Sequence, residues 1–284
     1  MLADIFTSLS TALEPIPTGL SPKLPKLDDI QTVIFDVYGT LVVSGTGDIS
    51  IAQTIDREAE LRSILEKCGH TPSGKPNLSK TFYSLIKEDH SAAKAKGAAY
   101  PEVDILEIWE RFFDVTTTSV PDCDALKEIA IRFECAVNPV WPMPYLLDLL
   151  NGLKDRSMPT GIVSNAQFYT PVMVEGFTGQ TLERLGFQDD LCVWSYVERL
   201  GKPSVELFQK LTTALAARDI ASEQALYVGN DMLNDIWTAS QAGLRTALFA
   251  GDQRSLRLRE SDQRCKNLEP DVVLTALPQL WEVL

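Results

Sequence analysis

The sequence predicts an α/β protein built on a doubly wound parallel sheet, with an all-helical segment inserted into it. After residue 139, short apolar strands alternate with amphipathic helices, which is the pattern of parallel βαβ units. Between residues 45 and 138, apolar residues recur with helical periodicity and no strand separates them. One apolar segment at 33–35 precedes these helices and has the character of a first strand. We therefore expect one sheet that is interrupted after its first strand.

The first strand leads directly into an acidic residue and a glycine turn at 36–41. Asp36 would lie at the carboxyl edge of the sheet, where open α/β folds bind their ligands. An aspartate has an unperturbed pKa of about 3.9, so Asp36 is ionised near neutral pH and can attack an electrophile without a base. On this segment alone, a carboxylate that only stabilises a turn is an equally good interpretation.

The inserted segment is predicted to hold four amphipathic helices that cover this edge of the sheet. Both of its connections leave from the end of the strand that carries Asp36, so the helices would exclude water from that end. Residues 42–50 are small and polar and are predicted to form a flexible hinge. The apolar positions that define the four helices are Leu61, Ile64, Leu65 and Cys68; Leu78, Phe82, Leu85 and Ile86; Ile105, Ile108, Trp109 and Phe112; and Leu126, Ile129 and Phe133.

The remaining elements follow the βα alternation. Gly243 is expected to end the last long helix as a C-cap, and four prolines within 14–25 predict an extended arm before the first strand. The predicted domains are an N-terminal arm at 1–28, a sheet core at 29–44 and 139–284, and a helical cap at 45–138. Strands are expected at 161–163, 192–194, 226–228, 246–249 and 272–274. Helices are expected at 145–156, at 204–218 and at 233–242, and one further helix, after the strand at 161–163, is expected to end near 186.

Composition and charge exclude several classes of function. A net charge of -13 argues against sequence-independent binding to nucleic acid. Five widely spaced cysteines suggest neither a disulfide framework nor a thiolate metal site and favour a reducing, cytoplasmic compartment, and two histidines make a His-based zinc site or a Ser-His-Asp triad improbable. Residues 1–20 lack the pattern of a signal peptide, and no apolar stretch is long enough to cross a bilayer. We expect a small-molecule substrate, and the sequence leaves the oligomeric state open.

Polar residues follow three of the later strands or their connections. Ser164 and Asn165 come directly after the strand at 160–163, where a hydroxyl or a backbone N–H can hold an oxygen of a bound anion. Lys202 stands between Gly201 and Pro203 at the start of a helix, so its ammonium would be presented from a rigid corner next to Asp36. A serine that caps a helix and a surface lysine are the ordinary alternatives.

The third of these segments, at 229–235, carries two acids four residues apart on the first turn of a helix. With Asp36, the side chains of Asp231 and Asp235 would bring three carboxylates to one point. Such an arrangement calls for a hard cation with oxygen ligands, typically Mg²⁺. Acids that only complement a helix dipole are the alternative, but the preceding strand and glycine make it the weaker one.

Taken in order, the segments 36–40, 164–165, 201–203 and 229–235 resemble the four motifs of the haloacid dehalogenase superfamily. The resemblance runs from about Thr32 to Leu284 and implies a Rossmann-like core with a helical C1-type cap inserted after the first motif. It implies Asp36 as the nucleophile that forms a covalent ester or acyl-phosphate, with Lys202 screening the negative charge that develops. The other residues implied to position or bind the substrate are Tyr38, Gly39, Thr40, Ser164 and Asn165.

The resemblance also implies a Mg²⁺ ion. It would be held by Asp36, by the backbone carbonyl of Tyr38, and by Asn230 or Asp231, between which the sequence does not decide. Asp235 would hydrogen-bond to Lys202 or to metal-bound water.

The reaction is less well defined than the family. Phosphatases of this superfamily usually carry a second aspartate two positions after the nucleophile, as the acid for the leaving alcohol, and this chain has Tyr38 there. A tyrosine at this position resembles the metal-independent 2-haloacid dehalogenases, but those carry a tyrosine six positions after the lysine, where this chain has Phe208. We expect a Mg²⁺-dependent phosphatase-type hydrolase acting on a small organic phosphate. A 2-haloacid dehalogenase and a catalytically weak binding or regulatory protein are the alternatives.

Overall fold

A computed structural model describes residues 1–46, 56–72, 77–117 and 119–284. Its main sheet has six parallel strands in the order β5-β4-β1-β6-β7-β8. The central strand is β1, which pairs with β4 on one side and β6 on the other, so the residue after β1 lies between two other strand ends. The strands are β1 Thr32–Phe35, β4 Thr160–Ser164, β5 Phe187–Trp194, β6 Ala225–Gly229, β7 Arg245–Phe249 and β8 Val272–Leu274.

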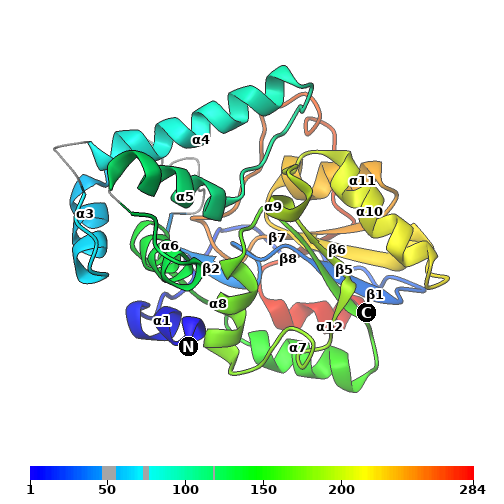
Figure 1. Cartoon of the computed structure of the whole chain (residues 1–284). Helices are drawn as coiled ribbons and strands as arrows, with labels where there is room; N and C mark the ends of the chain where they lie inside the picture. The colour runs from blue at the N-terminus through cyan, green and yellow to red at the C-terminus, as the bar shows by residue number, and fades with distance from the viewer. Residues whose placement is uncertain (47–55, 73–76, 118) are drawn as a thin grey trace.

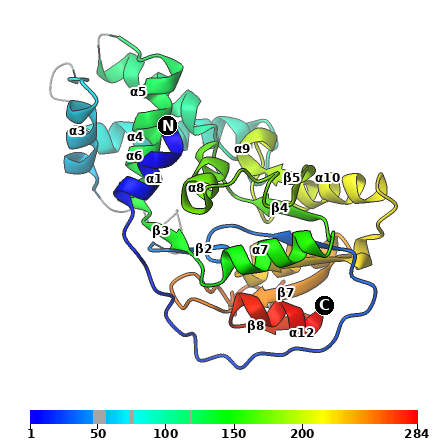
Figure 2. The same ribbon diagram turned by 90° about the horizontal axis from the view of Figure 1, so that it is seen from below.

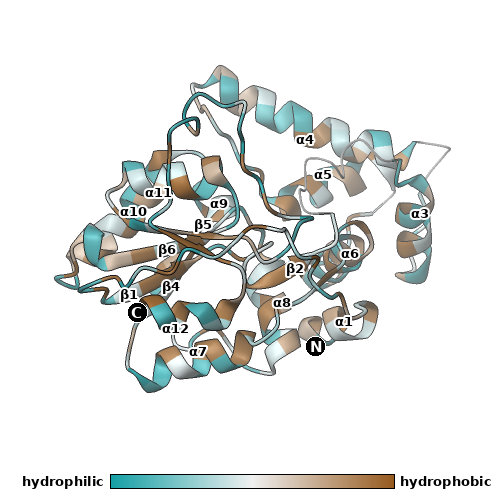
Figure 3. Cartoon of the chain, turned by 180° about the vertical axis from the view of Figure 1, so that it is seen from behind, coloured by the Kyte–Doolittle hydropathy of each residue, from teal (hydrophilic) through white to brown (hydrophobic). Residues whose placement is uncertain are grey.

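Helices cover both faces of this sheet, as the doubly wound prediction requires. Successive side chains of a strand point to opposite faces, and in β1 the apolar residues Val33 and Phe35 on one face and Ile34 on the other are all fully buried. Val33 and Phe35 pack in the cluster that includes α7, α8 and α12, whereas Ile34 packs in the cluster that includes α10 and α11. Figure 1 shows α10 and α11 on one side of the strands and α7 and α12 on the other, and in Figure 2 α7 and α12 lie in front of the sheet. Figure 3 shows the strands as largely apolar. These helices are α7 Leu146–Asp155, α8 Tyr169–Thr178, α10 Val205–Ala216, α11 Thr238–Gln241 and α12 Leu280–Val283.

The four predicted helices of the inserted segment are all present and share an apolar cluster of their own. Aromatic rings dominate this cluster: the ring centroids of Phe82 and Trp109 are 4.6 Å apart, and those of Trp109 and Phe133 are 5.6 Å apart. We call these helices the helical block. They are α3 Glu58–Lys67, α4 Leu78–Ala95, α5 Ile105–Thr116 and α6 Cys123–Val137. The boundaries of the three domains given above stay predictions.

Two segments near the N-terminus differ from the sequence prediction. Residues Leu2–Leu9 form the helix α1, not part of an extended arm, because Ile5 and Phe6 bury their side chains against α6 and α8. In the predicted hinge at 42–50, Val42–Ser44 is a buried strand, β2, which pairs antiparallel with β3 at Val140–Pro142. Residues 47–50 of that hinge lie outside the described residues.

Two later helices also differ from the sequence prediction. The helix expected to run to about 186 ends at Thr178, because Gly179 adopts the left-handed conformation that caps it. The helix expected at 233–242 begins as a π-helix, Met232–Trp237, and becomes α-helical at Thr238. Among the described residues, every helix is too short or too polar to cross a bilayer.

Candidate active site

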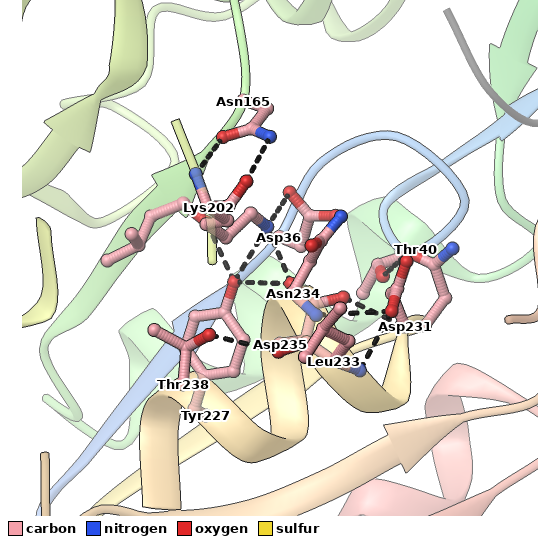
Figure 4. A network of polar contacts seen from close by, with 12 residues as sticks. Asp36, Thr40, Asn165, Lys202, Tyr227, Asp231, Leu233, Asn234, Asp235 and Thr238 are labelled. Carbon is pink, nitrogen blue, oxygen red and sulfur yellow. Dashed lines mark hydrogen bonds and ion pairs between the residues drawn. The ribbon is translucent and has the colours of Figure 1, made fainter. Parts of the chain in front are cut away.

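The carboxyl ends of the central strands bring three predicted residues into direct contact. Asp36 follows β1, Asp235 lies just after β6, and Lys202 comes from the connection between β5 and α10. The Lys202 ammonium lies 2.9 Å from Oδ1 of Asp36 and 2.6 Å from Oδ1 of Asp235 (Figure 4). The side chains of Lys202 and Asp235 are almost completely buried, whereas that of Asp36 remains 11% exposed. Asp36 is thus the carboxylate of this group that a substrate can reach.

Asn165 fixes the backbone from which Lys202 projects. Its side-chain oxygen accepts the Lys202 N–H at 2.6 Å, and its side-chain nitrogen donates to the Lys202 carbonyl at 3.3 Å. Asn165 was predicted as a substrate-binding residue. In the structure its two hydrogen bonds hold the Lys202 backbone in place, because a two-point contact fixes both the position and the tilt of a peptide.

The charges of this group are strongly coupled. Burial by itself lowers the pKa of Lys202, but the carboxylates of Asp235 and Asp36 outweigh burial and hold that pKa above its ordinary value. Burial raises the pKa of Asp235 to about 6, against the lowering effect of Lys202. The Asp235 carboxylate lies directly against the end of β6: a Cβ at Gly229 would come within 2.4 Å of Asp235 Cγ, so the glycine makes room for it.

Tyr227 belongs to the same polar group, and sequence reasoning did not find it. Its hydroxyl donates to the carbonyl of Val163 at 2.7 Å, accepts from the Lys202 ammonium at 3.1 Å and lies 3.1 Å from Asp235. Its ring packs edge-on against Phe208, with centroids 4.9 Å apart. The sequence shows only a tyrosine in the middle of an apolar strand, which packing alone would explain.

Replacing Tyr227 by phenylalanine is expected to lower the free energy of unfolding by about 1–2 kcal/mol, because the Val163 carbonyl and Lys202 each lose a partner in a buried place. Urea unfolding followed by circular dichroism measures this change. Tyr145→Phe is the matched control, since the Tyr145 side chain is exposed. Equal stability of the two variants would show that the Tyr227 hydroxyl does not hold the group together.

The residues at 230–231 are already engaged within the protein. Oδ1 of Asp231 accepts the backbone N–H groups of Leu233 and Asn234, at 2.8 and 3.1 Å, and so caps the following helix. The Arg259 guanidinium binds both carboxylate oxygens, with Nη2 2.6 Å from Oδ2. Sequence reasoning did not single out Arg259, which lies in a loop without any motif.

Asn230 and Thr40 form the neighbouring contact. The Asn230 amide nitrogen donates to the Ser255 carbonyl at 2.6 Å, and the Thr40 hydroxyl donates to the Asn230 side-chain oxygen at 3.2 Å. Thr40 was predicted to position the group under attack. In the structure it is fully buried and its hydroxyl orients Asn230.

A small cavity of about 150 Å³ joins the predicted metal ligands, since Asp36, Tyr38, Asn230 and Asp231 all line it. The described residues contain no group of three or more His, Cys, Asp or Glu side chains arranged to hold a metal. Mg²⁺ does not require one, because it is usually bound through one or two carboxylates and keeps several waters. Two carboxylates and neutral oxygen donors around one cavity are the ligands this ion prefers. The donor set therefore fits Mg²⁺, on the condition that Asp231 exchanges Arg259 for the ion.

Three more predicted residues lie around Asp36. The Tyr38 hydroxyl is 2.9 Å from that of Thr170, and burial raises the pKa of Tyr38 well above its ordinary value, so this phenol is a poor proton shuttle. The Ser164 hydroxyl is buried and has no hydrogen-bond partner among the described residues, which leaves it able to donate to a bound anion. Gly39 has a φ of +80°, and a Cβ there would lie 2.5 Å from that of Ser255, so the turn after Asp36 requires glycine.

A larger cavity of about 430 Å³ lies between the helical block and the edge of the sheet. It is lined by aromatic side chains of α4, α5 and α6 and by residues of the connection between α4 and α5. Tyr38, Asn165 and Lys202 line both cavities. A molecule whose reactive group lies at Asp36 can therefore extend beneath the helical block.

Comparison with known proteins gives partial matches to two curated phosphatases. The glyceraldehyde 3-phosphate phosphatase of Pyrococcus furiosus is 36% identical over 87 residues, which are 31% of this chain and 33% of that protein. The ribulose-1,5-bisphosphate 5-phosphatase of Halopiger xanaduensis is 31% identical over 105 residues, which are 36% of this chain and 43% of that protein. The chain therefore spans less than half the length of these curated relatives.

A solved structure and a family model extend over most of the chain. The crystal structure of 2-haloacid dehalogenase from Pseudomonas syringae pv. Tomato DC3000 superposes with a TM-score of 0.51 at 23% identity, covering 89% of this chain and 97% of that one, which shows a shared fold. The model of haloacid dehalogenase-like hydrolases matches residues 30–243, the span that contains Asp36, Lys202 and Asp235. With the six-stranded sheet and its acidic edge, this match shows that the chain belongs to the haloacid dehalogenase-like hydrolases.

Proposed function

We propose that this hydrolase is a Mg²⁺-dependent phosphatase that acts on a small organic phosphate through Asp36. One observation carries the proposal: the partly exposed Asp36 carboxylate lies 2.9 Å from a buried ammonium, in a cavity that Asp231 also lines. A carboxylate that a substrate can reach, a fixed positive charge and a second carboxylate at one point support this proposal. Phosphoryl transfer depends mainly on such positioning and charge stabilisation.

The residues of the site support a two-step reaction. The Asp36 carboxylate attacks phosphorus, a P–O bond forms as the P–O bond to the leaving group breaks, and the leaving oxygen takes a proton from water. A water molecule then hydrolyses the acyl-phosphate, which releases inorganic phosphate and restores the carboxylate. Lys202 and the Ser164 hydroxyl offset the negative charge of the phosphoryl oxygens. Mg²⁺, when bound, would neutralise further charge on the phosphoryl group.

The two curated relatives are phosphatases by name, which supports phosphate ester hydrolysis over the alternatives. The Asp231 carboxylate supports it too, because it lines the same cavity as Asp36, and two carboxylates in one cavity suit Mg²⁺. The net charge of -13 disfavours nucleic acid as the substrate. It favours a small substrate whose anionic group binds next to Lys202.

Tyr38 is the observation that favours dehalogenation as the second candidate. A buried phenol bonded to Thr170 cannot deliver a proton efficiently, and a halide leaving group does not need one. If the protein is a phosphatase, we expect it to prefer esters of acidic alcohols or phenols, which leave with little protonation.

The assay that tests the proposed function combines aryl phosphates and 2-chloropropionate, each with Mg²⁺ and with a chelator. We expect phosphate release that stops on chelation and returns when Mg²⁺ is added, because the cation balances the carboxylates around Asp36. Chloride release that chelation leaves unchanged would assign the protein to the dehalogenases instead. Neither product on a broad panel would mean that the fold serves binding without turnover.

A further inference from the structure

The larger cavity carries acidic groups that the proposed phosphoryl transfer does not use. Glu102 and Glu134 both line it, and Glu134 is buried. Glu134 contacts the Tyr169 hydroxyl, and Glu102 lies 3.4 Å from the side-chain nitrogen of Gln167. Tyr169 and Gln167 also line the cavity, so both carboxylates belong to its wall.

Among the described residues, both carboxylates form hydrogen bonds only with neutral groups. Glu134 accepts from the Tyr169 hydroxyl at 2.8 Å and from the side-chain nitrogen of Asn138 at 3.0 Å. Glu102 accepts from the backbone N–H of Val103 at 2.9 Å and from the Ser195 hydroxyl at 3.1 Å.

Within the described part of the chain, neither carboxylate forms an ion pair. Arg199 is close enough to lower the pKa of Glu102, but its guanidinium pairs with Glu107. Lys94 also lines the cavity, but it is an exposed residue. Among the described residues, no cationic side chain therefore forms an ion pair that balances the charge of Glu102 or Glu134.

Leaving these acids without a cation has an energetic cost. Burial raises the pKa of Glu102 to about 7 and also raises that of Glu134. A carboxylate in such a place is expensive to ionise unless it is paired. A positively charged ligand group in the cavity would lower this cost of ionisation.

The cavity wall has two further features that point to a ligand. The indole N–H of Trp109 and Nε2 of His90 belong to residues that line it, and neither atom has a hydrogen-bond partner among the described residues. Trp109 is completely buried. The rings of Phe82, Tyr83 and Tyr100 supply apolar and π-rich surface. Aromatic faces combined with carboxylates are a common environment for an organic ammonium group.

We infer that this cavity binds the organic part of the substrate and that Glu102 and Glu134 recognise an ammonium group on it. The substrate class is then a phosphomonoester of an apolar or aromatic alcohol that carries an amine. The inference rests on the proposed function, because the phosphate is placed at Asp36. The volume of about 430 Å³ accommodates an aromatic ring with a short side chain.

Three probes that differ in one group test this inference. They are tyramine O-phosphate, its isostere para-propylphenyl phosphate, and the phosphate of para-hydroxyphenylpropionate, all with phenolic leaving groups. We expect kcat/KM of the holoenzyme to be about 10- to 100-fold higher for the ammonium probe than for the propyl probe, through KM, and lowest for the carboxylate probe.

Variants then assign the preference to the two acids. Glu134→Gln and Glu102→Gln are each expected to reduce the ammonium-to-propyl ratio of kcat/KM by about tenfold, without a comparable effect on the propyl probe. Glu128→Gln is the matched control, because Glu128 is on the same helix as Glu134 but pairs with Arg132. If the two acids only stabilised the fold, each substitution would change kcat/KM for both probes by the same factor and leave the ammonium-to-propyl ratio unchanged.

Binding without turnover separates this inference from the proposed function. Asp36→Asn with Mg²⁺ is titrated with the ammonium and propyl probes by calorimetry. Tighter binding of the ammonium probe, together with no phosphate release by the wild type, would support the cavity inference and overturn the phosphatase. Phosphate release without any preference for the ammonium probe would overturn the cavity inference alone. This comparison tests the cavity inference and the proposed function separately, even if neither glutamine variant folds.

Discussion

Asp36→Asn is expected to reduce kcat by at least about ten-thousand-fold while the protein stays folded. The reason is geometric, because the other two acids are engaged: Asp235 is fully buried against Lys202 and Asp231 is bound by Arg259. An amide has the shape of the carboxylate, and its oxygen can still accept from Lys202. It cannot, however, form an acyl-phosphate that water hydrolyses.

The stability of the Asp36→Asn variant must also be measured, because unfolding alone would abolish its activity. Asp36 adds a like charge that raises the pKa of Asp235, so removing the charge relieves repulsion and offsets the weaker contact with Lys202. We expect the free energy of unfolding to stay within about 1 kcal/mol of the wild type. Asp190→Asn is the control, since Asp190 pairs with Arg218 on the surface. Activity of Asp36→Asn above one part in about a hundred would rule out Asp36 as the nucleophile.

The placement of Asp36, Lys202 and Asp235 could be predicted because parallel strands deliver their carboxyl ends to one edge. The apolar runs of β1, β4 and β6 mark buried strands, and the residues that follow them must then be neighbours. The four helices of the block were predictable for a similar reason, since each carries an apolar stripe at helical spacing.

The parts that sequence reasoning missed depend on contacts between distant segments. The helix α1 forms because Phe6 is buried against the ring of Phe177 and its neighbours, which no local pattern indicates. Arg259 reaches Asp231 from a loop, and Glu134 looks like one more residue of an amphipathic helix until α8 brings Tyr169 to it. Charged or hydroxyl side chains whose partners come from tertiary structure alone cannot be assigned from spacing.

Lys202→Met is expected to have the largest effect on stability, a loss of about 3–5 kcal/mol at neutral pH. Methionine fills a similar volume but leaves the carboxylates of Asp36 and Asp235 facing each other without the charge between them. Breaking a buried ion pair by removing one partner costs more than the pair itself contributes, because the remaining charge is left desolvated. Activity should be lost as well, since nothing else described at Asp36 supplies a fixed positive charge at 2.9 Å.

The pH dependence of this loss identifies its cause. Without Lys202, the pKa of Asp235, already raised to about 6 by burial, must rise further. The folded variant then binds more protons than its unfolded chain across neutral pH, so its stability falls as pH rises and recovers as pH falls. Urea unfolding should therefore show a smaller deficit relative to the wild type at pH of about 5 than at about 8. Lys202→Met combined with Asp235→Asn should recover much of the loss at the higher pH, because the second change removes the carboxylate that lost its partner. A deficit that is equal at both pH values and persists in the double variant would mean that lost packing, and not an unpaired buried charge, destabilises the protein.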